Sequence, residues 1–189
     1  MRTRGKAAVV VAAVLLTGCT AGGTGTGGQA RPPASSAPAP GASASAGACP
    51  DSGVRVTLGD TEAALGQRAL SVFLDNCGGR PFEVSGYPDV AVLDAEREEL
   101  DVTVRLGTHA VDGGTERSVF TLQPGQRAKS GVLWRNTVTR SDVVATSGAY
   151  LRVTPARGAA PQAVAPHDGP LDLGNTDAVE VTPWAPYTP

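Results

Sequence analysis

The chain is poor in the side chains that usually carry catalysis or bind transition metals. Its 189 residues include one methionine (the initiator), two histidines and three cysteines. The soft site of an envelope copper carrier needs several Met or His ligands, so we exclude that class. Serine-hydrolase motifs are missing as well, because neither Gly-x-Ser-x-Gly nor Ser-x-x-Lys occurs. The sequence therefore predicts no catalytic residues, no metal site and no cofactor.

An excess of one charge and a long apolar run are also lacking. Lys and Arg total 16, Asp and Glu total 18, and the formal net charge is −2. Without a basic run or a Lys/Arg-rich face, nucleic acid is not an expected partner. The apolar run from Ala7 to Leu16 has ten residues, half of the ~20 that a helix needs to cross a bilayer. No stretch has the i, i+3, i+4 apolar pattern of a substantial helix.

The N-terminus has the layout of a secretory signal peptide over residues 1–18. A basic start (Arg2, Arg4 and Lys6) precedes the short apolar run, and small residues follow it. The tetrapeptide Leu16-Thr17-Gly18-Cys19 resembles the lipobox of bacterial lipoproteins, in which the cysteine thiol receives a diacylglyceryl group before cleavage. Two acyl chains hold a protein stably on a bilayer. The resemblance implies lipidation of Cys19 and a location on the extracytoplasmic face of the cell membrane, and an ordinary signal peptide is the alternative.

Residues 19–48 are expected to form the lipidated cysteine and a disordered linker. The linker consists almost entirely of Gly, Ala, Pro, Ser and Thr, and Arg31 is its only charged residue. Such a segment cannot bury enough apolar surface to offset the entropy lost on ordering. As a flexible coil it spans ~30 Å root-mean-square, which suits a spacer between a bilayer and a folded domain.

From residue 49 to residue 189 the pattern changes to the alternation of apolar and polar residues that is typical of β-strands. The segment Val90–Leu93 is instead continuously apolar, which suits a strand covered on both faces. Many short strands separated by Gly, Pro and Asp predict an all-β domain, an immunoglobulin-like β-sandwich, with Trp134 in its core. Strands are expected over 54–58, 67–75, 89–94, 100–106, 118–122, 127–135, 149–154, 163–165 and 179–181.

Cys49 and Cys77 remain as an even pair once Cys19 is assigned to lipid, in a compartment that favours oxidation. If segments 54–58 and 67–75 form a hairpin centred near residue 63, residue i faces residue 126 − i, and Cys49 falls opposite Cys77. We therefore predict a disulfide that closes the open end of this hairpin. A free thiol pair and a metal site are the alternatives, although no histidine is near either cysteine in the sequence.

Three elements of the domain form a recognisable set: Asn76; Gly86-Tyr87-Pro88-Asp89-Val90 leading into Val92-Leu93-Asp94; and Leu122-x-Pro124-Gly125-x-x-Ala128 leading into Val132-Leu133-Trp134. Together they resemble a family of actinobacterial secreted and lipid-anchored proteins, domain-of-unknown-function family 4232. The resemblance covers about residues 49–181 and implies a β-sandwich at the cell surface without an assigned activity. The family pattern would place the second cysteine at Phe82, whereas here Cys77 follows Asn76.

The dipeptide Pro124-Gly125 fits the two central positions of a type II turn, which we expect between two strands.

Three aromatic residues form the candidate binding surface: Tyr87, Trp184 and Tyr187. Tyr87 lies between Gly86, which permits a sharp turn, and Pro88, which raises the chance of a cis peptide bond. The tail over residues 182–189 has alternate prolines, which favour an extended chain. There Trp184 either caps one end of the sandwich or is exposed, with Tyr187, as a docking segment for a partner.

These features predict a lipid-anchored surface protein whose non-catalytic module binds a protein or glycan partner in the envelope or outside the cell. Two other classes stay open. A hydrolase with a dispersed active site would need His109 or His167, each in a Gly- or Pro-flanked loop, to meet a serine or a carboxylate in a cleft. An ion-binding protein would use carboxylates that suit Ca²⁺, in a segment that lacks the spacing of a calcium loop and that we interpret as a solvated turn. That segment contains Asp94, Glu96, Glu98, Glu99 and Asp101.

Overall fold

The computed structural model of the chain describes residues 47–107 and 119–188, which fall within one compact unit. These residues form strands and no helix, so none of them belongs to a helix that could span a membrane. The predicted all-β class is therefore confirmed. The strands are β1 (Val54–Ala64), β2 (Gln67–Asn76), β3 (Phe82–Ser85), β4 (Asp89–Leu93), β5 (Thr103–Leu106), β6 (Val119–Leu122), β7 (Arg127–Arg135), β8 (Thr146–Gly148), β9 (Tyr150–Thr154), β10 (Gln162–Val164), β11 (Leu171–Gly174), β12 (Ala178–Val181) and β13 (Ala185–Tyr187).

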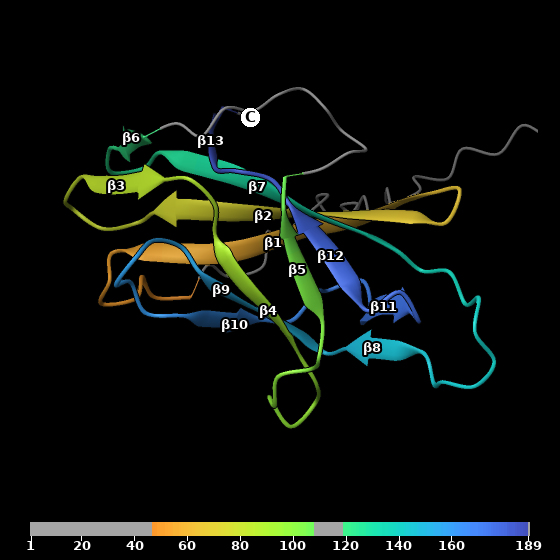
Figure 1. Cartoon of the computed structure of the whole chain (residues 1–189). Helices are drawn as coiled ribbons and strands as arrows, with labels where there is room; N and C mark the ends of the chain where they lie inside the picture. Colours follow the sequence, from red (N-terminus) through yellow and green to blue (C-terminus); the bar gives the residue numbers. More distant parts are fainter. Residues whose placement is uncertain (1–46, 108–118, 189) are drawn as a thin grey trace, which may run out of the picture. The chain divides into compact units, whose positions relative to one another are not determined.

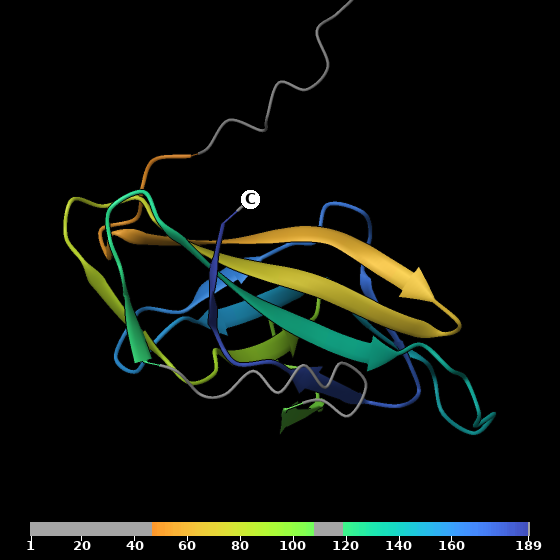
Figure 2. The same cartoon turned by 90° about the horizontal axis from the view of Figure 1, so that it is seen from above.

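The strands form a β-sandwich of two facing layers (Figures 1 and 2). In the first layer the sheet order is β1-β2-β7-β12-β5, and β13 pairs with the first part of β7. Its pairs are antiparallel except for β12 with β5, which is parallel. The second layer contains the sheet β10-β9-β4. Two further pairs, β11 with β8 and β3 with β6, complete the fold.

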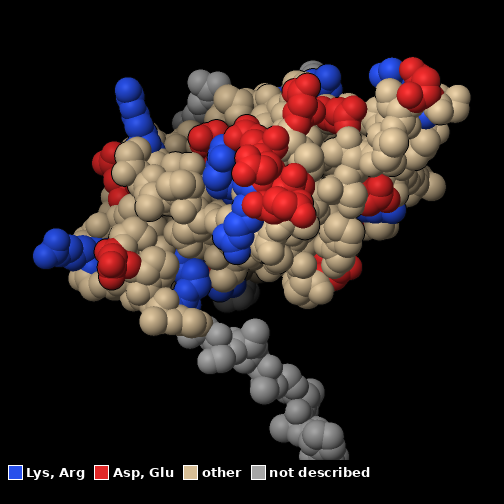
Figure 3. Space-filling view, turned by 90° about the horizontal axis from the view of Figure 1, so that it is seen from below, with Lys and Arg blue, Asp and Glu red and all other residues tan. Residues whose placement is uncertain are grey.

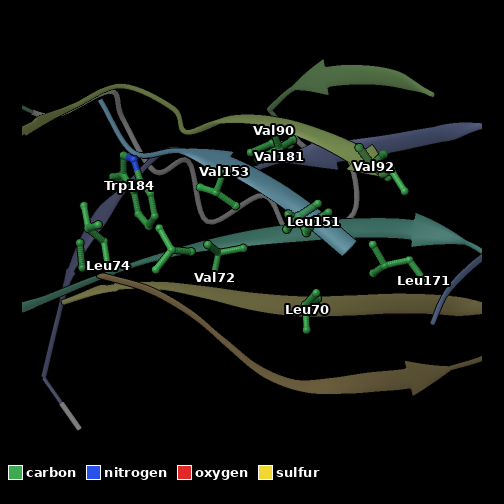
Figure 4. Packing of buried hydrophobic residues seen from close by; sticks show 14 of the residues in the cluster. Leu70, Val72, Leu74, Val90, Val92, Leu151, Val153, Leu171, Val181 and Trp184 are labelled. Carbon is green, nitrogen blue, oxygen red and sulfur yellow. The ribbon is translucent and has the colours of Figure 1, made fainter. Parts of the chain in front are cut away.

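The core lies between the layers because alternate residues of each strand point inward. In Figure 4, Leu70 and Val72 of β2 and Leu151 and Val153 of β9 belong to one cluster of packed side chains. Each of these four is at most 1% exposed, and burying a side chain of this size contributes ~1.5–3 kcal/mol. Trp134 is also buried, as predicted, and its indole Nε1 donates a hydrogen bond to a backbone carbonyl oxygen of β11 at 2.8 Å.

The disulfide between Cys49 and Cys77 is present, with the two Cα atoms 5.7 Å apart, so the predicted pairing is confirmed. The register used to predict it is wrong, because Val54 faces Asn76 rather than Val72. The cysteines therefore lie beyond the paired end of the β1–β2 hairpin, in the segments that enter β1 and leave β2.

The β1–β2 hairpin is longer than predicted. A bulge between Leu58 and Thr61 keeps the Gly59–Asp60 step within the strand, and pairing continues to Ala64. The chain then turns at Leu65-Gly66, where both residues have positive φ, as a two-residue type I′ turn requires. Residues 59–66 thus form a bulge, the end of strand β1 and a tight turn, rather than a loop.

Asn76, at the end of β2, is a polar side chain that is only 1% exposed. Its Nδ2 donates to the carbonyl oxygens of Arg80 and Leu122, both at 2.8 Å, and its Oδ1 accepts from the Gly78 N–H at 3.2 Å. Its backbone carbonyl accepts from Gly125, which has a φ of +82° in the predicted type II turn. The Asn76 side chain therefore joins the loop after Cys77 to β6, and the Asn76 backbone holds the turn that precedes β7.

Side chains rather than another strand cover the outer edge of β1. The Gln162 amide accepts from the Val56 N–H (3.0 Å) and donates to the Val54 carbonyl oxygen (3.1 Å), so it takes the place of a neighbouring peptide unit. Farther along β1, the Asp168 carboxylate accepts from the N–H (2.6 Å) and the hydroxyl (3.0 Å) of Thr61. These bonds satisfy backbone groups that an edge strand otherwise leaves open.

Candidate functional site

The outer face of the first layer carries two rows of side chains that cross β1, β2, β7 and β13. Figure 2 views the sheet from this side. The residues of these rows point outward because their neighbours along β2 and β7 are buried in the core. The first row consists of Arg55, Asp75, Arg127 and Tyr187, and the second of Thr57, Phe73, Lys129 and Ala185. We define the Phe73–Tyr187 patch as Phe73, Asp75, Arg127, Lys129 and Tyr187.

Two aromatic rings and two cations form the centre of this patch. The ring centroids of Phe73 and Tyr187 are 5.2 Å apart and their planes meet at 54°, within the range of favourable aromatic pairs. The guanidinium carbon of Arg127 lies 4.9 Å from the Phe73 centroid. The Lys129 Nζ lies 5.9 Å from the Phe73 centroid and 5.8 Å from that of Tyr187. Contacts of this kind contribute ~0.5–1 kcal/mol each at exposed sites, so the rings restrict where both cations lie.

Asp75 fixes the orientation of Arg127. The arginine donates from Nε to Oδ1 at 2.5 Å and from Nη2 to Oδ2 at 3.1 Å. The side chains of Arg127 and Asp75 are 39% and 23% exposed, and an ion pair in that setting contributes ~1 kcal/mol or less to stability. Its main effect is geometric, because the two-point contact holds the plane of the guanidinium beside the aromatic rings.

An open groove of about 740 Å³ adjoins the patch. Its volume lies within the range of ~300–1,000 Å³ that is usual for small-molecule sites. Its lining offers two aromatic rings, an oriented guanidinium, a carboxylate, an amide and hydroxyl groups, which can bind a ligand by stacking, ion pairing and hydrogen bonding. The groove is lined by Asp75, Phe120, Thr121, Leu122, Gly125, Gln126, Arg127, Pro186, Tyr187 and Thr188.

The three aromatic residues predicted as a binding surface are not brought together. Tyr187 lies in the patch, whereas Tyr87 is half-buried and packs against the core. Trp184 is fully buried and its Nε1 donates to the Pro155 carbonyl oxygen at 2.9 Å. The capping interpretation of Trp184 is therefore confirmed, and its side chain is not available to a partner. Gly86 has a φ of +64°, as a sharp turn requires, but the described residues contain no cis peptide bond.

Sequence reasoning missed Phe73, Arg127 and Lys129. The available signal was the register of β2, in which alternate aliphatic residues point inward and Phe73 occupies an outward position. A large aromatic residue at an outward position is a reason to look for a surface site. The pairing of β13 with β7, which brings Tyr187 to Phe73, leaves no mark in the local sequence pattern.

His167 lies on the open surface next to Asp60, with Nε2 2.5 Å from the Asp60 Oδ1 and the two side chains 59% and 86% exposed. The neighbouring Asp168 accepts from the backbone N–H of Thr61, and this bond lowers the pKa of the Asp168 carboxyl below its ordinary value. The His167–Asp60 and Asp168–Thr61 contacts together hold the β10–β11 loop against the bulge of β1. His109, the other histidine considered for catalysis, lies outside the described residues.

The acidic segment between β4 and β5 forms an exposed turn. The Asp94 Oδ1 accepts from the Glu98 N–H at 2.8 Å, and the Glu99 Oε2 accepts from the Arg152 Nη2 at 2.7 Å. Figure 3 shows acidic side chains gathered in a patch together with basic ones on the face seen from below. Within residues 47–107 and 119–188, no three His, Cys, Asp or Glu side chains converge so that they could hold a metal ion. The exposure of residues 95–99 and the hydrogen bond from Glu98 to Asp94 are those of a solvated turn.

The fold and the site define a disulfide-bonded β-sandwich that presents an aromatic and cationic patch on one sheet face. The chain belongs to the family described as a domain of unknown function (DUF4232), whose family model matches residues 49–185. The search of the curated proteins and the search of the solved structures each gave no match. The family-model match confirms the predicted domain family, for which no function is described.

Proposed function

We propose that the protein is an actinobacterial lipoprotein that binds an envelope or extracellular partner through the Phe73–Tyr187 patch and catalyses no reaction. The observation that carries this proposal is the patch itself. Two aromatic rings and two cations lie on the solvent side of a sheet whose other side is the core, and an arginine there is oriented by a two-point ion pair. Aromatic and Arg side chains are the residues most often found at the energetic centres of binding surfaces.

The location is supported by the N-terminal sequence and by the cysteine chemistry. The lipobox-like segment Leu16-Thr17-Gly18-Cys19 supplies a thiol for acylation. The Cys49–Cys77 disulfide suits an oxidising compartment, where such bonds persist. A linker of the length and composition of residues 20–48 would let the domain reach a partner some distance from the bilayer.

Replacing Cys19 by serine is expected to release the protein from membranes without altering the fold. The serine hydroxyl does not take part in the thiol chemistry that attaches the diacylglyceryl group, so the two acyl chains that give stable anchoring would be missing. Fractionation of cells that produce the wild-type and Cys19→Ser chains, with thermal unfolding of both proteins, measures the effect. Equal retention of both chains in the membrane fraction would contradict the anchor.

Capture of envelope material is expected to depend on the patch. We expect the immobilised Cys19→Ser chain to retain a cell-wall component from envelope extracts, and the further changes Phe73→Thr and Tyr187→Thr to reduce that retention at least tenfold. Both rings lie on the outer face, so these changes leave the core intact.

The matched control replaces two other exposed apolar residues, Val138 (65% exposed) and Val144 (92% exposed), by threonine. This control tests for non-specific hydrophobic capture and is expected to leave retention unchanged. A retained component that survives the patch changes, or is lost in the control to the same extent, would refute a role for the patch in binding.

A further inference from the structure

We infer that the Phe73–Tyr187 patch is a binding site for an acidic polysaccharide, with the aromatic rings packing on sugar rings and with Lys129 and Arg127 pairing with the acidic groups. This inference rests on the proposed binding function and names the class of ligand. It is carried by the distribution of charge, by the extended shape of the site and by the mixture of side chains in it.

The charge around the patch is positive although the whole chain has a net charge of −2. Arg55, Arg127 and Lys129 lie in the two adjacent rows, against the single carboxylate of Asp75. By contrast, acidic side chains gather on the face seen from below in Figure 3, and the β4–β5 turn lies on that lower side in Figure 1. A guanidinium has five N–H donors, and the pair with Asp75 uses only the Nε and Nη2 groups of Arg127. The outer face at this end of the sheet therefore attracts an anion.

The site is elongated. Neighbouring strands lie ~4.8 Å apart, so a row that crosses from β1 through β2 and β7 to β13 is about 14 Å long. Beside Phe73 no large side chain projects from the sheet, because Gly59 has no side chain and that of Ser71 is small. The groove of about 740 Å³ continues from the β13 end of the rows. A ligand that lies along this surface is extended rather than compact.

The mixture of side chains favours an acidic polysaccharide over a protein partner. A stable protein interface buries ~800 Å² per partner around an apolar centre. Here the centre consists of two rings with cations placed over them, and Gln126, Thr121 and Thr188 line the groove. Sugar rings present C–H faces to aromatic rings and hydroxyls to amides, and a carboxylate or phosphate on the sugar pairs with Lys and Arg.

The test is isothermal titration calorimetry of the full Cys19→Ser chain at low salt with three polymers. Polygalacturonate is the acidic polysaccharide, its fully methyl-esterified form has the same sugar rings without charge, and polyglutamate has carboxylates without sugar rings. We expect binding to polygalacturonate, at least tenfold weaker binding to each of the other two, and weakening by 0.5 M salt. Lys129→Gln and Tyr187→Ala should each reduce the affinity for polygalacturonate at least tenfold, whereas Arg157→Gln, at an exposed loop position, should not.

Equal binding of polygalacturonate and polyglutamate, or an affinity unchanged by Lys129→Gln and Tyr187→Ala in folded protein, would overturn the ligand class. Absence of binding to polygalacturonate would overturn it as well. If envelope capture still depends on Phe73 and Tyr187 in those cases, the proposed binding function stands with a different ligand. If envelope capture is also independent of the patch, both the ligand class and the binding function fail.

Discussion

Replacing Trp184 by alanine is expected to lower the free energy of unfolding by about 4 kcal/mol. Truncation of a buried tryptophan costs ~3–5 kcal/mol, because apolar burial is lost and a cavity is left. Trp184 has no exposed surface, and its Nε1 donates to Pro155 while its backbone N–H donates to Gly86. The change therefore also removes the side-chain contact that fixes the tail before β13. Urea denaturation followed by the fluorescence of Trp134, the other tryptophan, measures the loss.

Two companion variants make this prediction specific. Trp184→Phe keeps most of the buried volume but loses the hydrogen bond, so its cost should be smaller, about 1–2 kcal/mol. Tyr187→Ala changes an aromatic residue in the same tail that lies on the outer face, and it should cost about 1 kcal/mol or less. Equal losses for Trp184→Ala and Tyr187→Ala would mean that Trp184 does not cap the core.

Replacing Cys49 by serine is expected to lower the free energy of unfolding by about 3.5 kcal/mol. The disulfide closes a loop with a sequence separation of 28, and the chain-entropy model gives a stabilisation of this size for such a loop. The bond also holds the segment before β1 to the end of β2, next to the buried Asn76. Chemical denaturation of the wild-type and variant chains, each with and without a reducing agent, measures the effect.

Reduction supplies the internal control for this prediction. Wild-type protein should lose stability when it is reduced, whereas Cys49→Ser should not respond to the reducing agent. The double change Cys49→Ser with Cys77→Ser should cost no more than the single change, because one bond is lost in both cases. A wild-type protein that is equally stable in its oxidised and reduced forms would contradict a structural role for the disulfide.

Most of the strand positions followed from the sequence because local alternation defines them. Burial alternates with a period of two along β2 and along β7 as far as Val132, and both strands were predicted within a residue of their ends. β3, β8, β11 and β13 were missed because each has only three or four residues, several with Gly or Pro, and owes its pairing to a partner distant in sequence. The extension of β1 was missed for a related reason, since the Gly59–Asp60 bulge breaks the alternation without ending the strand.

Less of the candidate site could be predicted, because a site depends on which strands become neighbours. The aromatic residues of the tail marked it as a candidate binding segment, but Trp184 and Tyr187 lie in different environments. Trp184 lies in the core, whereas β13 pairs with β7 and carries Tyr187 to the outer face next to Phe73. Nothing within residues 182–189 separates these outcomes, because they are decided by the contact of the tail with a strand 56 to 60 residues earlier in the chain.

The side chains that cover the outer edge of β1 affect whether copies of this protein can pair edge to edge at high concentration. An open strand of 11 residues would offer a second copy a run of unpaired peptide groups, from which fibrils could grow. Gln162 and Asp168 already occupy part of that run. These bonds therefore limit edge-to-edge pairing between copies, and substituting Gln162 would remove part of that protection.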